Sequence, residues 1–429
     1  MSTMFSALSV RNYRIYFTGA LISNIGTWMG RVAQDWVVLT ELSDNSATAL
    51  GIVTGLQFLP ILLFTPIAGA ISDSFSKRNI MLVSQSLMGI FALITGLWVL
   101  SGGMVLWQMY LMAFLSGLAS ALDAPSRQAF VSEMVPRDRV ANAVGLNSAS
   151  FHSGRLIGPG TAGLMIAAVG TGPTLIVNSF TFVAVLIALL MLDRAALTGG
   201  PDRTKPRGKV SEGLAYVRRR PDLILIMVIA FMHGTFGLNF QLTNALMSTE
   251  AFHKGVTDYG ITGSVMAIGS LAGALLAARR ERPRWRLLLG SLFLFSFFTL
   301  GVALAPTFTI FLVLLVPTGL TAMTVMVSAN AMIQLTTDQA VRGRVLALYM
   351  TVFMGGTPLG APFIGWVGEA FGARWTVLMA TIACGLTAVV ATIYVMRHDN
   401  LRLRLRASWT RPLALERGAV IEPVPEKVN

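Results

Sequence analysis

Apolar stretches alternate with short polar segments along the whole chain. Each stretch is long enough to cross a bilayer as an α-helix, which takes about 20 residues. The pattern therefore predicts an all-α membrane protein with twelve transmembrane helices. We expect them at residues 13–42, 47–71, 79–101, 104–124, 140–169, 173–192, 222–248, 258–278, 285–305, 308–335, 345–370 and 375–396.

The composition agrees with a membrane protein and excludes several other classes. The chain is 54% hydrophobic and 12% charged, whereas a soluble chain has about 25% charged residues. The net charge of +13 does not indicate a nucleic-acid partner, because the basic residues lie between the spans and form no single patch. The one cysteine, Cys384, lies inside an apolar span, so no disulfide can form within the chain. Residues 1–14 lack the features of a cleaved signal peptide, and we expect the first span to target the membrane.

The distribution of basic residues predicts the orientation in the membrane. With a cytoplasmic N-terminus, Lys254 and Arg374 lie outside, and Arg31 and Arg155 lie within spans. The other 29 of the 33 lysines and arginines then face the cytoplasm. This positive-inside bias predicts an inner-membrane protein with both termini cytoplasmic, since the number of spans is even.

A basic segment rich in glycine and proline, residues 193–221, divides the spans into two sets of six. We expect an N-terminal six-helix bundle at residues 1–192, a cytoplasmic linker at 193–221 and a C-terminal six-helix bundle at 222–396. Residues 397–429 form a basic cytoplasmic tail that we expect to be disordered or to lie on the membrane surface. The charges of the linker are those of a solvated loop, although binding of anionic lipid headgroups is an alternative.

The two halves repeat each other. The sequence PRDRV at 136–140 resembles VRGRV at 341–345, and each opens a span. Three glycines of the fifth span recur 202 positions later in the eleventh: Gly158, Gly163 and Gly170 match Gly360, Gly365 and Gly372. A period of this size corresponds to a whole bundle, which is typical of a transporter built by duplication.

The polar sequence GAISDSFSKR at 69–78 connects the second and third spans. Its pattern of Gly69, Asp73, Lys77 and Arg78 resembles the signature loop of the major facilitator superfamily of transporters, although Ser74 and Ser76 depart from it. The resemblance implies two pseudo-symmetric six-helix bundles that rock around a central site.

The same resemblance implies a cytoplasmic gate. In this gate, Asp73 faces the start of helix 11, near residues 343–345, where the helix dipole places a partial positive charge. Asp123, at the end of helix 4, is expected to pair with Lys77, Arg78 or Arg127.

A second motif lies in the fifth span, at Gly154, Gly158, Pro159 and Gly163. Glycines at four-residue spacing let helices approach closely, and a proline frees a backbone carbonyl and kinks its helix. The motif resembles the antiporter motif of the superfamily, with Ala162 at its penultimate position. Together with SNIGTWMGRVAQDW and DAPSRQAFVSEMVP, it is similar to the branch that includes the enterobactin exporter and multidrug exporters, the transmembrane secretion effectors. Many proton-coupled drug exporters carry an arginine early in helix 4, where this chain has Ala113.

Charges inside spans are the candidate coupling residues. Arg31 and Asp35 lie one helical turn apart, and Arg155 lies at a similar depth in the fifth span. A charge at membrane depth is costly unless it is paired or hydrated, so these residues are functional candidates. Two hypotheses stay open: Asp35 carries the transported proton, or it forms a structural ion pair with Arg31 or Arg155.

Uncharged polar residues mark a candidate substrate path, and the resemblance implies that helices 1, 4, 7 and 10 line the central cavity. The candidates in helices 7 and 10 are His233, Asn239, Gln241, Asn244, Asn330 and Gln334. His152 and His233 have no partner at metal-ligand spacing, so we expect no metal site. Methionines such as Met323 and Met326 either pack the core or form an adaptable surface for bulky substrates.

The sequence thus predicts a secondary active transporter, which exports drug-like or siderophore-like small molecules by proton antiport. It lacks a GxxxxGK[ST] phosphate-binding loop, so we expect the proton gradient as energy source and no cofactor. An uptake permease of the same fold is the alternative. A membrane-embedded enzyme is disfavoured because HExxH and GxSxG motifs are absent, and the retained motifs disfavour a non-transporting receptor. We expect a monomer in the lipid bilayer.

Overall fold

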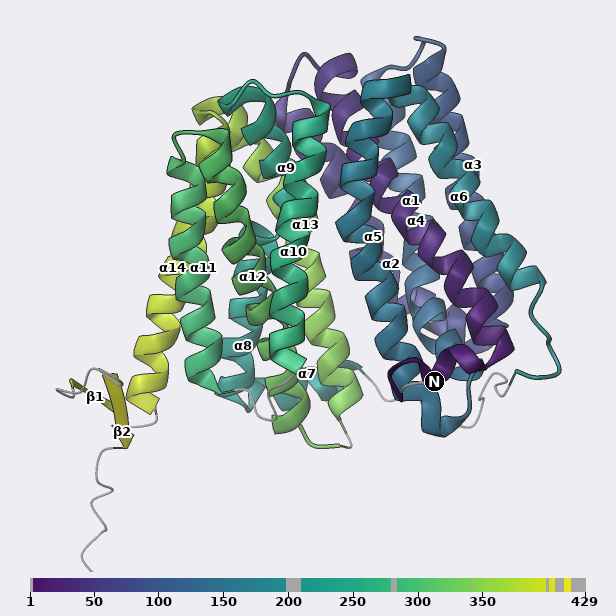
Figure 1. Cartoon of the computed structure of the whole chain (residues 1–429). Coiled ribbons are helices and arrows are strands. Elements are labelled where there is room, and N and C mark those ends of the chain that lie inside the picture. Colours follow the sequence, from purple (N-terminus) through teal and green to yellow (C-terminus); the bar gives the residue numbers. More distant parts are fainter. Residues whose placement is uncertain are drawn as a thin grey trace, which may run out of the picture.

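The computed structural model describes residues 3–197, 210–278, 284–339, 341–398, 401–405 and 413–417. Its long helices form two bundles that stand side by side (Figure 1). The N-terminal bundle consists of η1 (Thr3–Ser9), α1 (Arg11–Val37), η2 (Val38–Leu42), α2 (Ala47–Ser74), α3 (Lys77–Leu100), α4 (Leu106–Glu133), η3 (Arg137–Arg139), α5 (Val140–Val169) and α6 (Thr171–Leu190).

The C-terminal bundle follows the same plan. It consists of α7 (Val210–Arg218), α8 (Pro221–Met232), η4 (His233–Gly237), α9 (Phe240–Leu246), η5 (Met247–Ala251), α10 (Val256–Ala278), α11 (Trp285–Leu304), α12 (Phe308–Thr336), α13 (Arg342–Phe371) and α14 (Ala373–His398). Beyond it, β1 (Leu401–Leu405) and β2 (Leu413–Arg417) pair antiparallel, with Leu401 opposite Arg417. The all-helical prediction therefore holds for the bundles, and the described part of the tail forms a short hairpin.

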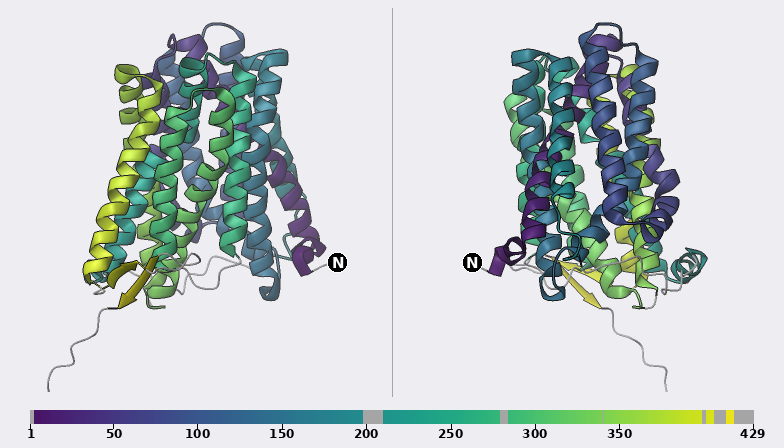
Figure 2. Two further views of the ribbon diagram at one scale, coloured as in Figure 1. Left: turned by 60° about the vertical axis from the view of Figure 1, so that its left-hand side comes forward. Right: turned by 90° about the vertical axis from the view of Figure 1, so that its right-hand side faces the viewer.

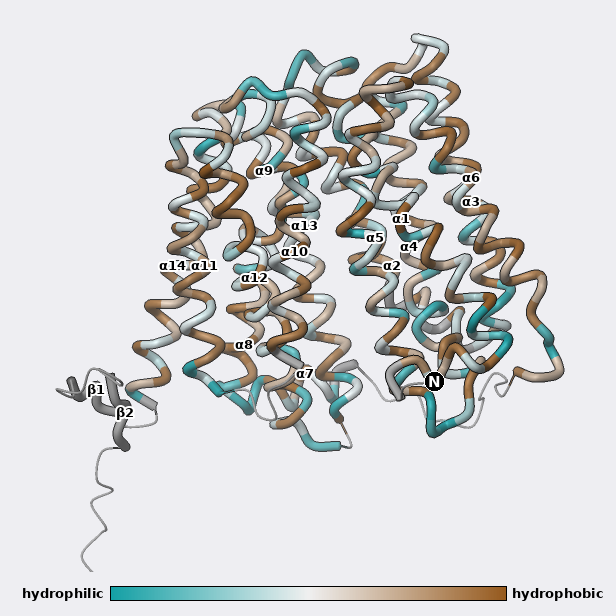
Figure 3. The backbone as a smooth tube through the Cα atoms, in the orientation of Figure 1, coloured by the Kyte–Doolittle hydropathy of each residue, from teal (hydrophilic) through white to brown (hydrophobic). Residues whose placement is uncertain are grey.

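Each of the twelve predicted spans coincides with a helical segment. Hydrophobic residues run along the helices, and hydrophilic residues gather toward their two ends (Figure 3). Among the described residues, nine helices are long and apolar enough to cross a membrane by length and composition alone. The long helices outside that set are α1, α4 and α5, and these three helices carry the charged candidates Arg31, Asp35, Asp123 and Arg155.

The seventh span is interrupted, where the sequence predicts a continuous helix over 222–248. It runs through α8, η4, α9 and η5, with π-helical geometry in η4 and η5 and a break at Leu238–Asn239. The Asn239 side-chain amide donates a 2.6 Å hydrogen bond to the carbonyl of Thr235 and so competes with the regular helical ladder. Gly234 and Gly237 add two residues of low helix propensity to the same turn.

The repeated glycines make equivalent contacts in the two bundles. A Cβ added at Gly158 would lie 2.5 Å from the Trp28 Cβ of α1, and one at Gly360 would lie 2.1 Å from the Thr235 carbonyl oxygen of η4. Five residues further along each helix, Gly163 packs on the backbone of α10, and Gly365 packs on the backbone of α2. Thus α5 and α13 each join a helix of their own bundle to a helix of the other one, as the internal repeat predicts.

Contacts between the two bundles concentrate at one end. We call the end that holds the N-terminus and α7 the terminal end, and the opposite end the distal end (Figures 1 and 2). The hydrogen bonds that join described residues of different bundles lie in the distal half and connect α1, α2 and α5 to α10 and α13. Toward the terminal end of α2, a Cβ at Gly69 would meet nothing within 4 Å. The structure is therefore closed at its distal end.

Candidate coupling and substrate site

The carboxylate of Asp35 lies at the contact between the bundles. Asp35 is near the distal end of α1 and is 3% exposed. The hydroxyl group of Tyr259, from α10, donates a 2.9 Å hydrogen bond to Asp35 Oδ2 and lies 3.4 Å from the Gln241 carbonyl oxygen. The Trp36 ring stacks on Tyr259 with the centroids 6.4 Å apart. A buried hydrogen bond thus connects a titratable group of one bundle to the other bundle.

The two arginines of the predicted charge layer gather around one aromatic ring. The Arg31 guanidinium carbon lies 4.9 Å from the centroid of the Trp28 ring, and that of Arg155 lies 5.4 Å from it. Arg31 also lies 5.3 Å from the Phe58 centroid. Cation–π attraction of this kind contributes about 0.5–2 kcal/mol per contact.

In this conformation Asp35 makes no ion pair with either arginine among the described residues. The Asp35 carboxylate is hydrogen-bonded to the Tyr259 hydroxyl group instead, and both hypotheses for Asp35, proton carrier and structural ion pair, stay predictions. The ion pair is absent because both guanidinium groups lie against the Trp28 ring. They are one to two helical turns from Asp35, toward the terminal end.

A small polar cavity adjoins Arg31 inside the N-terminal bundle. Its volume is about 90 Å³, and α1, α2, α3, α4 and α6 line it. The Gln57 side chain donates a 2.8 Å hydrogen bond to Gln34 Oε1, so two amides are held at its wall. Asn178 and Ser116 contribute further polar atoms. The cavity therefore offers a guanidinium and several neutral hydrogen-bonding groups to a small ligand.

The antiporter-like motif of α5 forms a joint between three helices. Gly154 and Gly158 lie against α1, whereas Pro159 and Gly163 lie against α10. Ser264 of α10 inserts its hydroxyl group between the Gly160 amide, from which it accepts at 3.1 Å, and the Leu156 carbonyl, to which it donates at 2.7 Å. A side chain inserted in the helical ladder next to a proline is a common cause of a helix kink. The motif therefore shapes α5 at the contact with the other bundle.

Asp123 is the centre of a buried polar network within the N-terminal bundle. Its Oδ1 accepts from Ser84 at 3.0 Å and from Gln85 at 2.9 Å, and its Oδ2 accepts from Arg127 at 2.6 Å. Arg127 in turn donates a 3.0 Å bond to Asn24 of α1. Of the three partners expected for Asp123, the structure selects Arg127, which lies one turn away on the same helix.

The other residues of the gating motif have different partners. Lys77 forms a 2.5 Å ion pair with Glu133 of α4, and Arg78 donates a 2.7 Å hydrogen bond to the carbonyl of Leu189 near the end of α6. Neither cation therefore pairs with Asp123. The side chain of Asp73 lies outside the part of the chain that the structure describes, so its expected contact with α13 stays a prediction.

The polar candidates of the substrate path separate into two groups. His233, Asn239 and Asn244 are buried at the interrupted helix, and the His233 Nδ1 atom lies 3.8 Å from the Cys384 sulfur. Gln241 is partly exposed. In α12 the Gln334 amide donates a 2.6 Å bond to Asn330 Oδ1 in an accessible position.

Burial therefore separates the six candidates in this conformation. The accessible candidates are Gln241, Asn330 and Gln334, whereas His233, Asn239 and Asn244 are packed within the C-terminal bundle.

Three residues of the contact between bundles escape the sequence analysis: Tyr259, Ser264 and Glu369. Glu369, near the distal end of α13, accepts hydrogen bonds from the Ser46 hydroxyl group at 2.9 Å and from the Thr48 amide at 3.1 Å. It therefore caps the first turn of α2 across the interface, where a carboxylate also interacts favourably with the helix dipole. A carboxylate near the end of a long apolar span is the pattern that marks Glu369, whereas a tyrosine and a serine within a span have no distinctive pattern.

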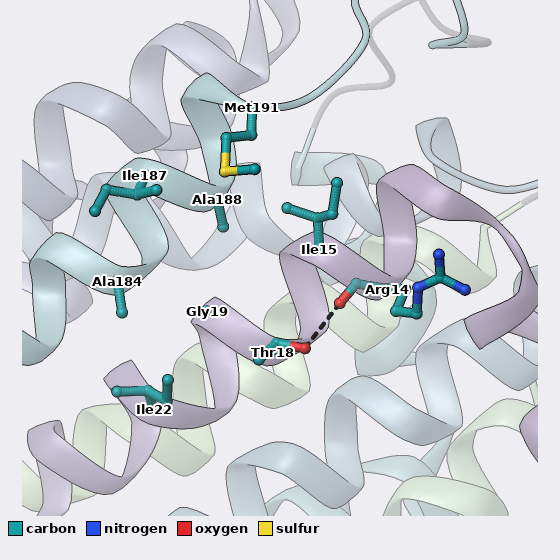
Figure 4. A pocket seen from close by; sticks show the side chains of 9 residues that line it. All are labelled: Arg14, Ile15, Thr18, Gly19, Ile22, Ala184, Ile187, Ala188 and Met191. Atoms are coloured by element: carbon teal, nitrogen blue, oxygen red, sulfur yellow. Dashed lines mark hydrogen bonds between the residues drawn. The ribbon is translucent and has the colours of Figure 1, made fainter.

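A larger groove of about 450 Å³ lies between α1 and α6 near the terminal end (Figure 4). Its walls are mainly apolar, and Ile22, Ile187 and Met191 are 44%, 50% and 57% exposed on the outer surface. Thr18 donates its hydroxyl group to the Arg14 carbonyl, as the dashed line shows (Figure 4). An outward-facing apolar groove suits a lipid chain, so we do not place the substrate there.

Comparisons with known proteins agree with this architecture. A family model described as transmembrane secretion effector matches residues 2–421. The multidrug efflux pump Tap of Mycolicibacterium fortuitum is 28% identical, with 90% of this chain and 95% of that protein covered. The staphyloferrin A transporter of Staphylococcus aureus is 23% identical, with coverage of 92% and 98%.

Solved structures show the same fold. A bacterial homologue of the human lysosomal transporter Spinster, in an inward-facing and unoccupied conformation, superposes with a TM-score of 0.67 at 16% identity, with 92% of this chain and 96% of that chain covered. A POT family transporter in complex with 5-aminolevulinic acid gives a TM-score of 0.72 at 10% identity, with coverage of 90% and 96%. The predicted twelve-helix, two-bundle architecture is confirmed by these matches.

Proposed function

Because the chain belongs to the transmembrane secretion effector family of the major facilitator superfamily, we propose that it exports drug-like or siderophore-like molecules in exchange for protons. Relatives named as a multidrug efflux pump and a staphyloferrin A transporter support this substrate range. Small molecules cross the membrane as the two bundles, residues 1–192 and 222–396, rock around a central site. The proton gradient drives the exchange, with no cofactor and no enzymatic step, and a monomer suffices.

The observation that carries the proposal is the Asp35–Tyr259 hydrogen bond. It buries a carboxylate where α1 of one bundle meets α10 of the other, in a structure that is closed at the distal end. Opening the distal end separates these helices and exposes Asp35, so the environment of this carboxylate depends on the conformation. A carboxylate that is desolvated in one state and hydrated in the other binds and releases a proton as the transporter turns over.

The terminal end faces the cytoplasm in this proposal, so the structure corresponds to an inward-facing state. The positive-inside distribution of lysine and arginine supports the assignment. Asp73 then acts in the outward-facing state, in which it holds the terminal end closed against the start of α13.

The orientation can be tested with single cysteines in a background that lacks Cys384. A cysteine at Ser101 or Lys254, both exposed at the distal end, reacts with an impermeant maleimide added to intact cells. A cysteine at Ser76, exposed at the terminal end, reacts only after the membrane is opened. Labelling of the Ser76 position in intact cells reverses the assignment.

Transport itself can be tested in everted membrane vesicles with an imposed proton gradient. The vesicles are screened for accumulation of dyes, antibiotics and siderophores. Accumulation that a protonophore abolishes supports proton-driven export. Uptake into right-side-out vesicles and none into everted ones supports the alternative, an uptake permease.

A further inference from the structure

Arg31 and Arg155 lie close together and form no ion pair among the described residues, although Asp35 attracts Arg31 electrostatically. Among the described residues, neither guanidinium group donates a hydrogen bond or pairs with a carboxylate, and their contacts are with the rings of Trp28 and Phe58. The carboxylate of Asp35, four positions after Arg31 in α1, accepts a hydrogen bond from Tyr259. Two cations and one anion leave this part of the membrane interior with a surplus of positive charge.

Such a surplus is costly at membrane depth unless water or a ligand compensates it. An unpaired charge in the bilayer costs about 3 kcal/mol or more, and two like charges add repulsion. Cation–π contacts compensate only part of this cost. A guanidinium group is also the group that binds carboxylates best, because its fork of donors matches both oxygens.

On these grounds we infer that Arg31 and Arg155, which both contact the Trp28 ring, bind a carboxylate group of the transported molecule. The inference rests on the proposed function and specifies its substrate class as organic anions. Both guanidinium carbons lie within 5.4 Å of one ring centroid, so they are at most about 11 Å apart. This upper limit leaves room for one carboxylate that contacts both guanidinium groups, or for two carboxylates of a polycarboxylate.

The space beside Arg31 sets the size of the bound group. The cavity of about 90 Å³ is lined by Arg31 and by the amides of Gln34, Gln57 and Asn178. Pockets for whole drug-sized ligands have about 300–1,000 Å³, so this one holds only a small headgroup. Arg31 and Arg155 are both only partly buried, so part of each side chain is accessible.

A direct test measures binding to the full-length protein in nanodiscs with two fluorescent dyes of similar size. Carboxyfluorescein is the anionic probe and ethidium the cationic one, and both are followed by fluorescence anisotropy, with citrate as competitor. We expect the wild-type protein to bind carboxyfluorescein and citrate to displace it. Arg31→Gln and Arg155→Gln should each weaken binding by about tenfold or more, since each removes a charge-assisted contact.

Four further variants separate a ligand contact from a packing role. Arg31→Lys and Arg155→Lys keep the positive charge but lose the two parallel N–H donors of the guanidinium group. We expect their affinities for carboxyfluorescein to lie between those of the wild-type protein and of the glutamine variants. Asp35→Asn removes the one carboxylate beside the arginines and should tighten carboxyfluorescein binding. Arg218→Gln removes one positive charge at an exposed position in α7 and should leave binding unchanged. Size-exclusion profiles and thermal midpoints verify that each variant is folded.

Wild-type affinity for carboxyfluorescein in folded Arg31→Gln and Arg155→Gln overturns the inference, as does tighter binding of ethidium than of carboxyfluorescein by the wild-type protein. The result of this binding test can be distinguished from the result of the transport test of the proposed function. Arginine-dependent binding of carboxyfluorescein without proton-driven transport refutes the antiport and keeps the anion site. Proton-driven export of ethidium without arginine-dependent binding of carboxyfluorescein supports the antiport and refutes the anion site.

Discussion

The two bundles share one plan of helices but differ in the charge that they bury. Among the described residues, the charged side chains that are almost fully buried are Asp35, Arg78 and Asp123, and all three belong to the N-terminal bundle. The buried polar residues of the C-terminal bundle are neutral, among them His233, Asn239 and Asn244. The two bundles therefore share a packing plan, while the almost fully buried carboxylates and guanidinium group of the described residues belong to the N-terminal bundle.

The C-terminal bundle differs from the N-terminal bundle in its backbone geometry as well as in its buried charge. Its first long segment contains two π-helical turns and a break, whereas the equivalent α1 is regular up to η2. Irregular turns within a helix frequently occur at functional sites and allow bending. Under the proposed function, we expect proton coupling in the N-terminal bundle and helix bending in the C-terminal one, and four predictions test this difference.

The largest effect is expected for Asp35. In Asp35→Asn no proton can be taken up at this site, so proton-driven export should fall to background while substrate exchange without a gradient persists. The matched change in the other bundle, Asn239→Ala, removes a buried amide but no charge, and proton coupling should survive. Transport in everted vesicles, with and without a gradient, measures both.

Expression levels distinguish this role from an ion pair. An Asp35 that merely compensates arginine would leave Asp35→Asn poorly folded, and a second change, Arg31→Gln or Arg155→Gln, would restore folding. Full proton-driven export by well-folded Asp35→Asn would rule out the carrier, and the charge difference between the bundles would then have another cause.

A second prediction tests whether the two bundles are packed equally. Gly158→Ala and Gly360→Ala place a Cβ within 2.5 Å and 2.1 Å of their neighbours, so both bundles must shift. Each change should destabilise the protein by about 1–3 kcal/mol, as overpacking does. Gly145→Ala in α5 and Gly343→Ala in α13 are matched controls, because an added Cβ there meets nothing within 4 Å. Thermal midpoints of the purified variants are the measurement, and a cost in only one bundle contradicts equivalent packing.

Sequence patterns predict the fold well because bilayer thickness dictates the length of each span. The fifth span has the same bounds in the sequence prediction and in the structure, residues 140–169. The seventh does not, because hydropathy averages over a helix and is insensitive to a single turn broken by the Asn239 side chain. Hydropathy also misses the end of α4, which continues to Glu133 with polar residues past the predicted end at 124.

The sequence identifies the candidate residues by their type, but it does not predict which residue each of them contacts. Charges within spans identify Asp35, Arg31 and Arg155, since few residues are so costly in a bilayer. The partner of Asp35 is a tyrosine 224 positions away, and no spacing rule connects the two. For Asp123 the i,i+4 spacing favours Arg127, which is the partner that the structure shows.

A third prediction concerns the joint between the bundles. Ser264→Ala removes the hydroxyl group that bridges the Gly160 amide and the Leu156 carbonyl of α5. Two backbone groups lose a hydrogen-bond partner, so we expect the free energy of unfolding to fall by about 1–2 kcal/mol and the transport cycle to slow. Ser148→Ala is the control, because the exposed Ser148 donates its hydroxyl group to the Val144 carbonyl within its own helix. Equal thermal midpoints for the two variants would show that Ser264 is not part of the joint.

The smallest effect is expected at the distal end, where Glu369 of one bundle caps α2 of the other. Its carboxylate is exposed, and exposed contacts with a helix N-terminus contribute about 0.3–1 kcal/mol. Glu369→Gln keeps the size of the side chain but weakens the cap, so the distal end should open more often. The fold should be unaffected, because the cap joins the two bundles and belongs to the interior of neither.

Accessibility measures this shift directly. With a cysteine at Ala361, which is fully buried against α2 in this structure, maleimide labelling should be up to about fivefold faster in Glu369→Gln than with Glu369 intact. The matched control is Glu41→Gln, since the hydrogen bond that Glu41 accepts comes from Thr171 of its own bundle. Equal labelling rates in Glu369→Gln and Glu41→Gln would show that the cap does not hold the bundles together. The distal closure would then rest on the glycine contacts of α2 with α13 and of α5 with α10.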